Sequence, residues 1–160
     1  MAVKSIPEGF RTVTPYLVLN NTAEAIDWYK KALGAEEVFR MNGPDGSVVH
    51  AEIKIGDSMI MMSDESRMNP GVKSPKTAGT ATAGVMLYVN DADALYNQAV
   101  AAGATVVHPI SDMFWGDRVG NVVDPYGHGW SIATHKEDVT PAEMEKRARA
   151  LYGKMAGGGA

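Results

Sequence analysis

Cysteine is absent from the 160 residues of this chain. Its absence excludes disulfides, iron–sulfur clusters, thiolate zinc sites and cysteine nucleophiles, and it is compatible with a reducing cytoplasm. Basic residues are also scarce, since 15 Lys and Arg stand against 19 Asp and Glu, for a formal net charge of −4. A nucleic-acid surface needs clustered positive charge to displace counterions from phosphate, so we expect no nucleic-acid partner.

Long apolar runs are missing as well. No segment approaches the roughly 20 apolar residues of a membrane span, and the opening MAVKSIPEGF lacks the apolar run of a signal peptide. We therefore expect a cytoplasmic protein with no membrane partner. The motifs of P-loop enzymes, α/β-hydrolases and HExxH metalloproteases are absent too, which argues against those activities.

A repeated pattern organises the hydrophobic residues, which make up 45% of the chain. Residues 11–63 predict a strand, a helix and three further strands, and residues 80–135 predict the same order. Aligning Gly34 with Gly103, the glycines that end the two expected helices, lays LGAEEV on AGATVV. Residues 64–79 lack periodicity and are expected to form a linker. The sequence thus predicts a single α+β domain of two tandem βαβββ modules.

A C-terminal helix is expected over residues 140–152, after the second module. Thr140 is a favourable N-cap residue at its start. Met144, Ala148 and Leu151 recur at helical spacing and form one apolar stripe. A stripe of this kind is typical of a packing surface, so we expect the helix to lie against the domain or against a second subunit.

The two consecutive βαβββ units resemble the vicinal oxygen chelate superfamily, which includes glyoxalase I, extradiol dioxygenases, fosfomycin-resistance enzymes and bleomycin-binding proteins. The residues that carry the resemblance are IDWYKKALGAE in the first helix and DPYGHGW before the last strand. The longer run FWGDRVGNVVDPYGHGWSIATHKEDVTPAEM is similar to the PhnB-like branch. The resemblance covers about residues 11–150. It implies that each module curls into a half-barrel, that paired modules enclose a cleft, and that the protein is a homodimer.

The resemblance also implies where a metal would bind. Metal-using members place one ligand on the first and last strand of each module, and these positions fall near Thr14, Met61, Gly84 and Ser131. A divalent ion prefers carboxylate or imidazole ligands, and none of these four residues supplies one. We therefore expect no metal cofactor, although a divalent ion held by other ligands stays open as an alternative.

His50 and Glu52 are the first candidates for a ligand site. They lie two residues apart on the expected strand SVVHAEIKI, so both side chains point to one face of the sheet. An imidazole beside a carboxylate can line a cleft or form half of a metal site. The alternative is an ordinary solvent-exposed face, with the opposite face buried. That opposite face would hold Val49, Ala51, Ile53 and Ile55.

Tyrosine and methionine side chains are expected to contribute the apolar lining. Tyr16 and Tyr88, on the first strands of the two modules, can each project into the cleft or pack under a helix. In the run MIMMSD, the resemblance turns Met59 and Met61 towards the cleft. Methionine lines adaptable pockets because its side chain is flexible and polarisable.

The loop SDMFWGDRVG supplies two further candidates. Trp115 could stack on a flat ligand, and the planar guanidinium of Arg118 could hold an anionic group. The alternative for Arg118 is a pair with Asp117 that fixes the loop. Trp130 is expected in the core, and the turn Asp124-Pro125-Tyr126-Gly127 is expected to act through its geometry.

The remaining histidines are His108, His128 and His135, and no short spacing between them indicates a metal motif. A structural or surface role is expected for each of them, with the ring of His128 bonded to local backbone.

Taken together, the sequence favours a protein that binds a small organic molecule. The rival is a divalent-metal lyase, isomerase or dioxygenase that uses His50 and Glu52, and a third hypothesis is a scaffold that binds partners through its C-terminal helix.

Overall fold

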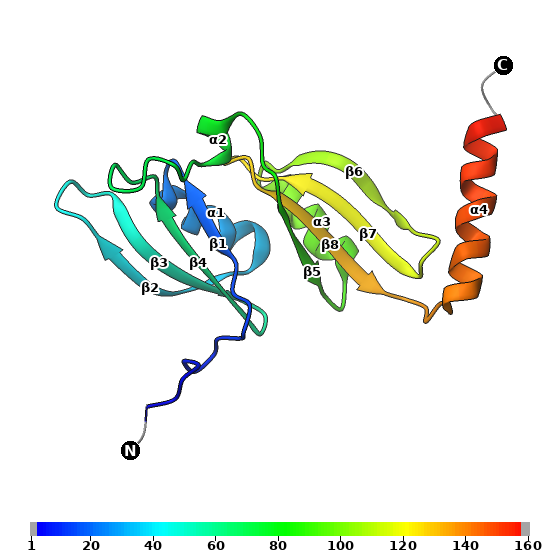
Figure 1. The fold of residues 1–160 in the computed structure, drawn as a ribbon, viewed down its shortest axis with the longest axis horizontal. Coiled ribbons are helices and arrows are strands. Elements are labelled where there is room, and N and C mark those ends of the chain that lie inside the picture. The colour runs from blue at the N-terminus through cyan, green and yellow to red at the C-terminus, as the bar shows by residue number, and fades with distance from the viewer. Residues whose placement is uncertain (1–2, 158–160) are drawn as a thin grey trace.

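The computed structural model describes residues 3–157 and contains two four-stranded sheets of the same topology (Figure 1). The first module consists of β1 (Tyr16–Leu19), α1 (Thr22–Leu33), β2 (Glu36–Asn42), β3 (Val48–Ile55) and β4 (Ser58–Asp64). The second consists of β5 (Gly84–Tyr88), α3 (Ala92–Ala101), β6 (Thr105–Asp112), β7 (Asp117–Val123) and β8 (Gly129–His135). The strand orders are β1-β4-β3-β2 and β5-β8-β7-β6. The predicted pair of βαβββ units is therefore confirmed.

The capping residues start both long helices of the modules as the sequence indicates. The Asn21 side chain accepts a hydrogen bond from the Glu24 backbone N–H at 3.3 Å, and Asp91 does the same for Ala94 at 2.9 Å. α1 ends at Gly34, whose φ of 66° lies in the left-handed region that favours glycine. Local capping therefore indicates where the helices start, and tertiary hydrogen bonds reinforce it, because the Thr22 N–H donates to Asp64 and the Ala92 N–H donates to Thr134.

The first strand is shorter than expected. The β-forming residues from Arg11 to Leu19 predict one strand, but β1 begins only at Tyr16. Pro15 has no N–H to donate to a sheet, so the regular pairing starts after it. The Pro15 carbonyl still accepts a hydrogen bond from the Met61 N–H at 2.9 Å, which aligns β1 with β4.

Two helices lie outside the modules. The segment between the modules contains α2 (Pro75–Ala78), a single turn whose N-cap is the buried Ser74. The second helix is α4 (Pro141–Gly157), which starts directly after Thr140 and runs beyond the predicted end of the helix. α4 stands at one end of the molecule, away from both sheets (Figure 1). Within residues 3–157, no helix is long and apolar enough to cross a membrane.

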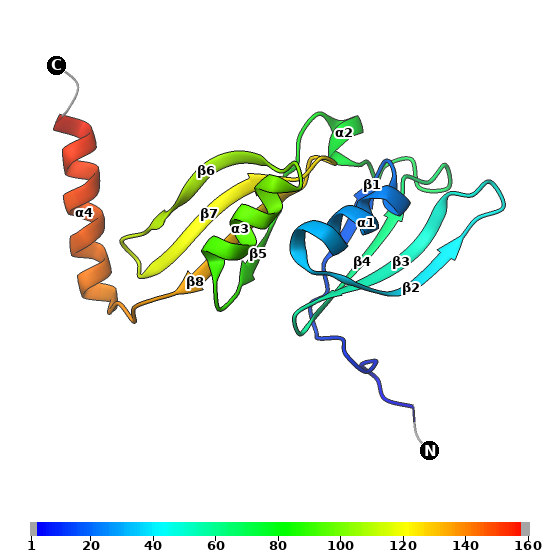
Figure 2. The same cartoon turned by 180° about the vertical axis from the view of Figure 1, so that it is seen from behind.

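Each sheet has one covered face and one open face. α1 and α3 lie on the same side of the molecule and cover one face of each sheet (Figure 2). Side chains on that side form a continuous core that contains Leu19, Ile26, Ile53, Met62 and Ile132. Trp130 is 1% exposed, which confirms its expected place in this core. Within residues 3–157, no helix lies on the opposite faces, so they are open to a ligand or a partner.

A buried carboxylate joins the two modules. Asp124, in the turn between β7 and β8, is 3% exposed. One of its oxygens accepts hydrogen bonds from the Tyr29 hydroxyl of α1 and from Trp130 Nε1, both at 2.8 Å. The other oxygen accepts the backbone N–H groups of Tyr126 and His128, each at 2.9 Å. The expected DPYG turn is therefore present, and its aspartate also bonds across the modules.

Two further hydrogen bonds cross the same interface. Trp28 Nε1 in α1 donates to the carbonyl of Ala102, at the end of α3, at 2.8 Å. His128 Nε2 lies 3.0 Å from the carbonyl of Val18 in β1, so this nitrogen carries the proton. The expectation that the His128 ring bonds local backbone was wrong, because the turn places the ring against the other module.

We expect the substitution Asp124→Ala to lower the free energy of unfolding by about 3 kcal/mol or more, since it leaves two buried side-chain donors without an acceptor. Tyr29→Phe removes one donor while the carboxylate keeps its other partners, so about 1 kcal/mol is expected. Urea denaturation followed by circular dichroism measures both values. The control is Asp57→Ala in an exposed turn, which should stay within about 0.5 kcal/mol of wild type. An Asp124→Ala protein as stable as this control would contradict the role given to Asp124.

Candidate functional site

A row of side chains crosses the open face of the first sheet. The strand register places Tyr16 beside Met61, Met61 beside Glu52, and Glu52 beside Phe39. Tyr16 and Phe39 are each about half exposed. An exposed row with two aromatic rings, a thioether and a carboxylate offers both an apolar surface and a polar contact to a small molecule.

His50 lies in the middle of this face and contacts three members of the row. Its Nδ1 is 3.4 Å from the Tyr16 hydroxyl, its Nε2 is 3.3 Å from Glu52 Oε1, and its ring centroid is 6.3 Å from that of Phe39. In the neutral ring, Nδ1 can accept from the tyrosine while Nε2–H donates to the carboxylate. The structure thus brings Tyr16, His50, Glu52 and Met61 together on one face.

The burial of β3 follows the predicted alternation except at Val49. Ala51, Ile53 and Ile55 are buried, as expected, but Val49 is 46% exposed and Val48 is buried instead. The register between β2 and β3 shifts here, because His50 pairs with Met41 while Val48 pairs with Asn42. The extra residue forms a bulge that turns Val49 away from the core.

Met59 lies on the same face of the sheet as Met61, but it is covered. The resemblance turned Met59 towards the cleft, but its side chain is only 7% exposed. Gly9, in the segment before β1, lies over this side chain, since a Cβ at Gly9 would be 3.8 Å from Met59 Cγ and 3.9 Å from Met59 Sδ. The N-terminal segment therefore covers Met59 and leaves Met61 as the half-buried methionine of the row.

A cavity of about 1090 Å³ lies at one end of this face, and we refer to it as the first-module cavity. Tyr16 and Val18 of β1 form one side. The rest of the lining comes from the β2–β3 connection, the end of β4 and the segment after β4, and it consists of Gly43, Pro44, Asp45, Ser47, Val48, Val49, Ser63, Asp64, Glu65, Ser66, Arg67, Met68, Asn69 and Val72. Tyr16 is therefore shared between the cavity and the row of side chains around His50.

The second module carries a different cluster, centred on Asp117. Its side chain is 5% exposed and accepts hydrogen bonds from Tyr88 Oη at 2.8 Å, Trp115 Nε1 at 3.1 Å and His135 Nδ1 at 2.8 Å. Burial opposes ionisation of Asp117, but the three hydrogen bonds outweigh burial and lower its pKa. The bond to this carboxylate also raises the pKa of Tyr88. Sequence spacing could not indicate this cluster, because its members come from three strands and a loop.

His135 bridges two carboxylates. Its Nδ1 faces Asp117, and its Nε2 lies 3.0 Å from the exposed carboxylate of Asp138. Both partners are acceptors, so a ring that bonds both must be an imidazolium. The hydrogen bonds to Asp117 and Asp138 accordingly raise the pKa of His135.

Arg118 is held by two aspartates. Its Nε and Nη2 donate to the two oxygens of Asp93 at 2.6 and 2.7 Å, and Nη1 donates to Asp112 at 3.1 Å. The sequence offered a pair between Arg118 and Asp117 as the alternative to ligand binding. Arg118 does pair with aspartates, but Asp117 was the wrong partner. Asp117 faces the opposite side of β7 from its neighbour Arg118, because successive side chains of a strand alternate.

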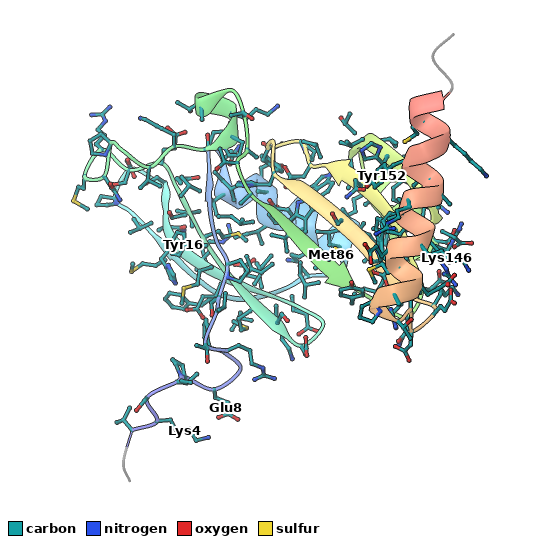
Figure 3. All side chains as sticks on the ribbon, turned by 45° about the vertical axis from the view of Figure 1, so that its right-hand side comes forward. Lys4, Glu8, Tyr16, Met86, Lys146 and Tyr152 are labelled. Carbon is teal, nitrogen blue, oxygen red and sulfur yellow. The ribbon has the colours of Figure 1, made fainter. Side chains whose placement is uncertain are left out.

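The sequence-predicted site residues therefore form two separate groups. Tyr16, His50, Glu52 and Met61 lie on the first sheet, whereas Tyr88, Trp115 and Arg118 lie around the second. Figure 3 shows this separation through Tyr16 and Met86, the labelled side chains of β1 and β5. The two sheets are joined through their helices, so a single chain does not bring the groups together.

The positions expected to hold a metal do not offer a suitable set of ligands. The strand register pairs Met61 with Tyr16 and Ser131 with Met86. Thr14 is therefore not paired with Met61, and Gly84 is not paired with Ser131. The Ser131 hydroxyl already accepts a hydrogen bond from Asn121. Among residues 3–157, no three His, Asp or Glu side chains gather in a way that could hold an ion.

Comparison with known proteins gives one family and several relatives. Residues 11–132 match the model of the Glyoxalase/Bleomycin resistance protein/Dioxygenase superfamily. An uncharacterized protein of Mycobacterium bovis is 40% identical over 135 residues, which is 83% of this chain and 89% of that protein. TioX from Micromonospora sp. ML1 has a similar structure, with 26% identity, a TM-score of 0.62, and coverage of 78% of this chain and 98% of TioX.

A second similar structure is that of a bleomycin-binding protein in complex with bleomycin. It is 21% identical to this chain, with a TM-score of 0.58, and the match covers 79% of this chain and 99% of that protein. At this identity the similarity establishes the fold alone.

We expect Asp117→Asn to lower the pKa of His135, because the substitution removes the carboxylate that favours the imidazolium form. An NMR titration of the His135 Cε1–H signal, assigned with His135→Gln, measures the change. The raised pKa stabilises the folded protein at pH values below about 6.5, the unfolded value. That stabilisation is lost as the pH rises through the folded pKa, and Asp117→Asn should reduce this pH dependence. An unchanged His135 titration would contradict the assignment, and Asp57→Asn serves as the distant control.

Proposed function

Because the chain belongs to the Glyoxalase/Bleomycin resistance protein/Dioxygenase superfamily, we propose that it is a PhnB-like, homodimeric protein of the cytoplasm that binds a small organic molecule without a metal ion. The observation that carries this proposal is the exposed row Tyr16–Met61–Glu52–Phe39 with His50 beside it. The row supplies an apolar, aromatic-edged surface on the face of the sheet that no helix covers.

The chemistry of the row favours an organic ligand with at least one polar group. Tyr16 and Phe39 each leave about half of their surface exposed, and burying aromatic surface is a strong source of binding energy. His50 and Glu52 are only 24% and 21% exposed, and they form a hydrogen-bonded pair that can orient the polar group. The complex of the bleomycin-binding protein offers a precedent for an organic molecule on this fold.

The exposed apolar side chains on both sheets support the homodimer. Tyr16 and Phe39 of the first sheet, and Met86 and Tyr88 of the second, are between 43% and 62% exposed. Exposed apolar patches of this kind commonly mark an interaction surface. A second copy would cover both faces and would complete the cleft that the two separate groups of candidate residues leave open.

The competing function is a metal-dependent lyase, isomerase or dioxygenase. The His50–Glu52 contact of 3.3 Å favours it, because an imidazole and a carboxylate are two of the ligands such an enzyme needs. The proposal of a metal-free protein predicts less than one divalent ion per chain when the protein is purified without chelator. Elemental analysis measures this content, and a stoichiometric metal that disappears in His50→Ala would establish the enzyme instead.

We expect the fluorescent probe 8-anilinonaphthalene-1-sulfonate, an aromatic and amphipathic anion, to bind saturably to the native protein. Phe39→Ala should weaken this binding by about tenfold, since it removes an aromatic contact worth roughly 1.4 kcal/mol. Val3→Ala, also an exposed apolar position, is the matched control and should leave the affinity unchanged. Unsaturable binding, together with no thermal shift from a panel of aromatic metabolites, would refute the proposal.

A further inference from the structure

Arg147 and Tyr152 connect α4 to the second module. Arg147 forms two hydrogen bonds of 2.8 Å with Glu137, in the segment before the helix, and a third with the Phe114 carbonyl at 3.4 Å. The Phe114 and Tyr152 rings lie edge to face, with centroids 6.4 Å apart. These contacts fix the direction of the helix, so α4 is a positioned element.

The second half of α4 exposes apolar surface. Leu151, Tyr152 and Met155 are 40%, 60% and 70% exposed. Helices in proteins take most of their stability from the packing of an apolar face. In Figure 3, Tyr152 and Lys146 are labelled on two sides of the helix, and the second module lies on the Tyr152 side. The apolar residues of the second half therefore need a surface that the second module provides only in part.

The first-module cavity offers a surface of the right character. Val49, Met68 and Val72, three of its lining residues, are 46%, 92% and 41% exposed. The cavity lies at the opposite end of the elongated molecule from α4 (Figures 1 and 2), so the helix cannot reach the cavity of its own chain.

The charges of the two surfaces are complementary. Asp45, Asp64, Glu65 and one base, Arg67, line the cavity, and Lys73 lies 4.0 Å from Glu65. The hydroxyl of Ser74, with that of Thr77, lowers the pKa of Glu65 to about 2, and the hydroxyl of Ser47 lowers that of Asp45. Both carboxylates are therefore ionised at neutral pH. α4 in turn carries four basic side chains, Lys146, Arg147, Arg149 and Lys154, against two acidic ones, Glu143 and Glu145, and Arg149 pairs with Glu145 within the helix.

We propose that α4 of each subunit packs across the first-module cavity of a second copy of this chain, with Leu151 and Met155 against its apolar wall and Arg149 and Lys154 near its carboxylates. The exchange is reciprocal, as a two-fold dimer requires, so both helices and both cavities are covered at once. This inference rests on the proposed homodimer. It adds that the partner supplies one wall of the cavity beside Tyr16, which makes the ligand site a composite of two subunits.

The absence of cysteine makes a cross-linking test straightforward, because any introduced thiol is unique. Met68→Cys is prepared with an affinity tag and Met155→Cys without one, and the two full-length proteins are mixed and treated with a flexible bis-maleimide. We expect a covalent heterodimer at a yield well above that of the control. The control is tagged Val107→Cys, at a half-exposed position on β6, mixed with the same Met155→Cys protein.

A charge variant tests the same contact without a cross-link. Arg149→Glu combined with Lys154→Glu should raise the dimer dissociation constant by at least about tenfold, measured by sedimentation. Lys146→Glu introduces the same kind of charge change in the first half of α4, and it should change the constant by less than about twofold. Adding Asp45→Lys to the double variant should recover part of the lost affinity.

The outcomes separate this inference from the homodimer itself. A dimer in sedimentation with no heterodimer above the control would overturn the placement of α4 and leave the homodimer standing. A chain that stays monomeric at all concentrations would overturn both. Binding of the monomeric chain to vesicles of anionic phospholipid would assign α4 to a membrane surface and would also refute the proposal.

Discussion

The rest of this structure depends on one buried carboxylate. Asp124 sits in a turn of the second module, yet it accepts the Tyr29 hydroxyl of the first module and the Trp130 indole of the core. Burial raises the pKa of Tyr29 well above its usual value, so its hydroxyl stays protonated and donates. Because a buried carboxylate is costly unless its hydrogen bonds are made, the two modules are held in one relative position.

That position decides where a ligand or partner can bind. The modules meet through α1 and α3, which cover the inner faces of both sheets, and the other faces stay open. The row around His50 and the cluster around Asp117 consequently lie on separate surfaces. A site that uses both needs a second subunit, which is why the proposed ligand cleft and the proposed dimer are parts of one hypothesis.

The two clusters also differ in what they leave for a ligand. In the first module, Tyr16 and Phe39 keep half of their surface exposed. In the second, the hydrogen-bonding groups of Tyr88, Trp115 and Arg118 are occupied by aspartates of the same chain. The first module is therefore the better candidate for recognition, and the second is better suited to holding the segment that leads to α4.

The sequence by itself determined the features that depend on local chemistry. Asn21 and Asp91 cap helices, Gly34 ends one, and the alternation along β3 placed His50 and Glu52 on the face opposite Ile53. Neighbouring residues are enough to indicate these features, and the repeated order of elements is enough to indicate the duplication of the βαβββ unit. Only the tertiary structure decided which distant groups meet. Asp117 accepts hydrogen bonds from Tyr88, Trp115 and His135. The His128 ring bonds the Val18 carbonyl, and a bulge in β3 exposes Val49. Sequence periodicity does not predict these contacts, because they depend on strand register and on how the two modules pack together.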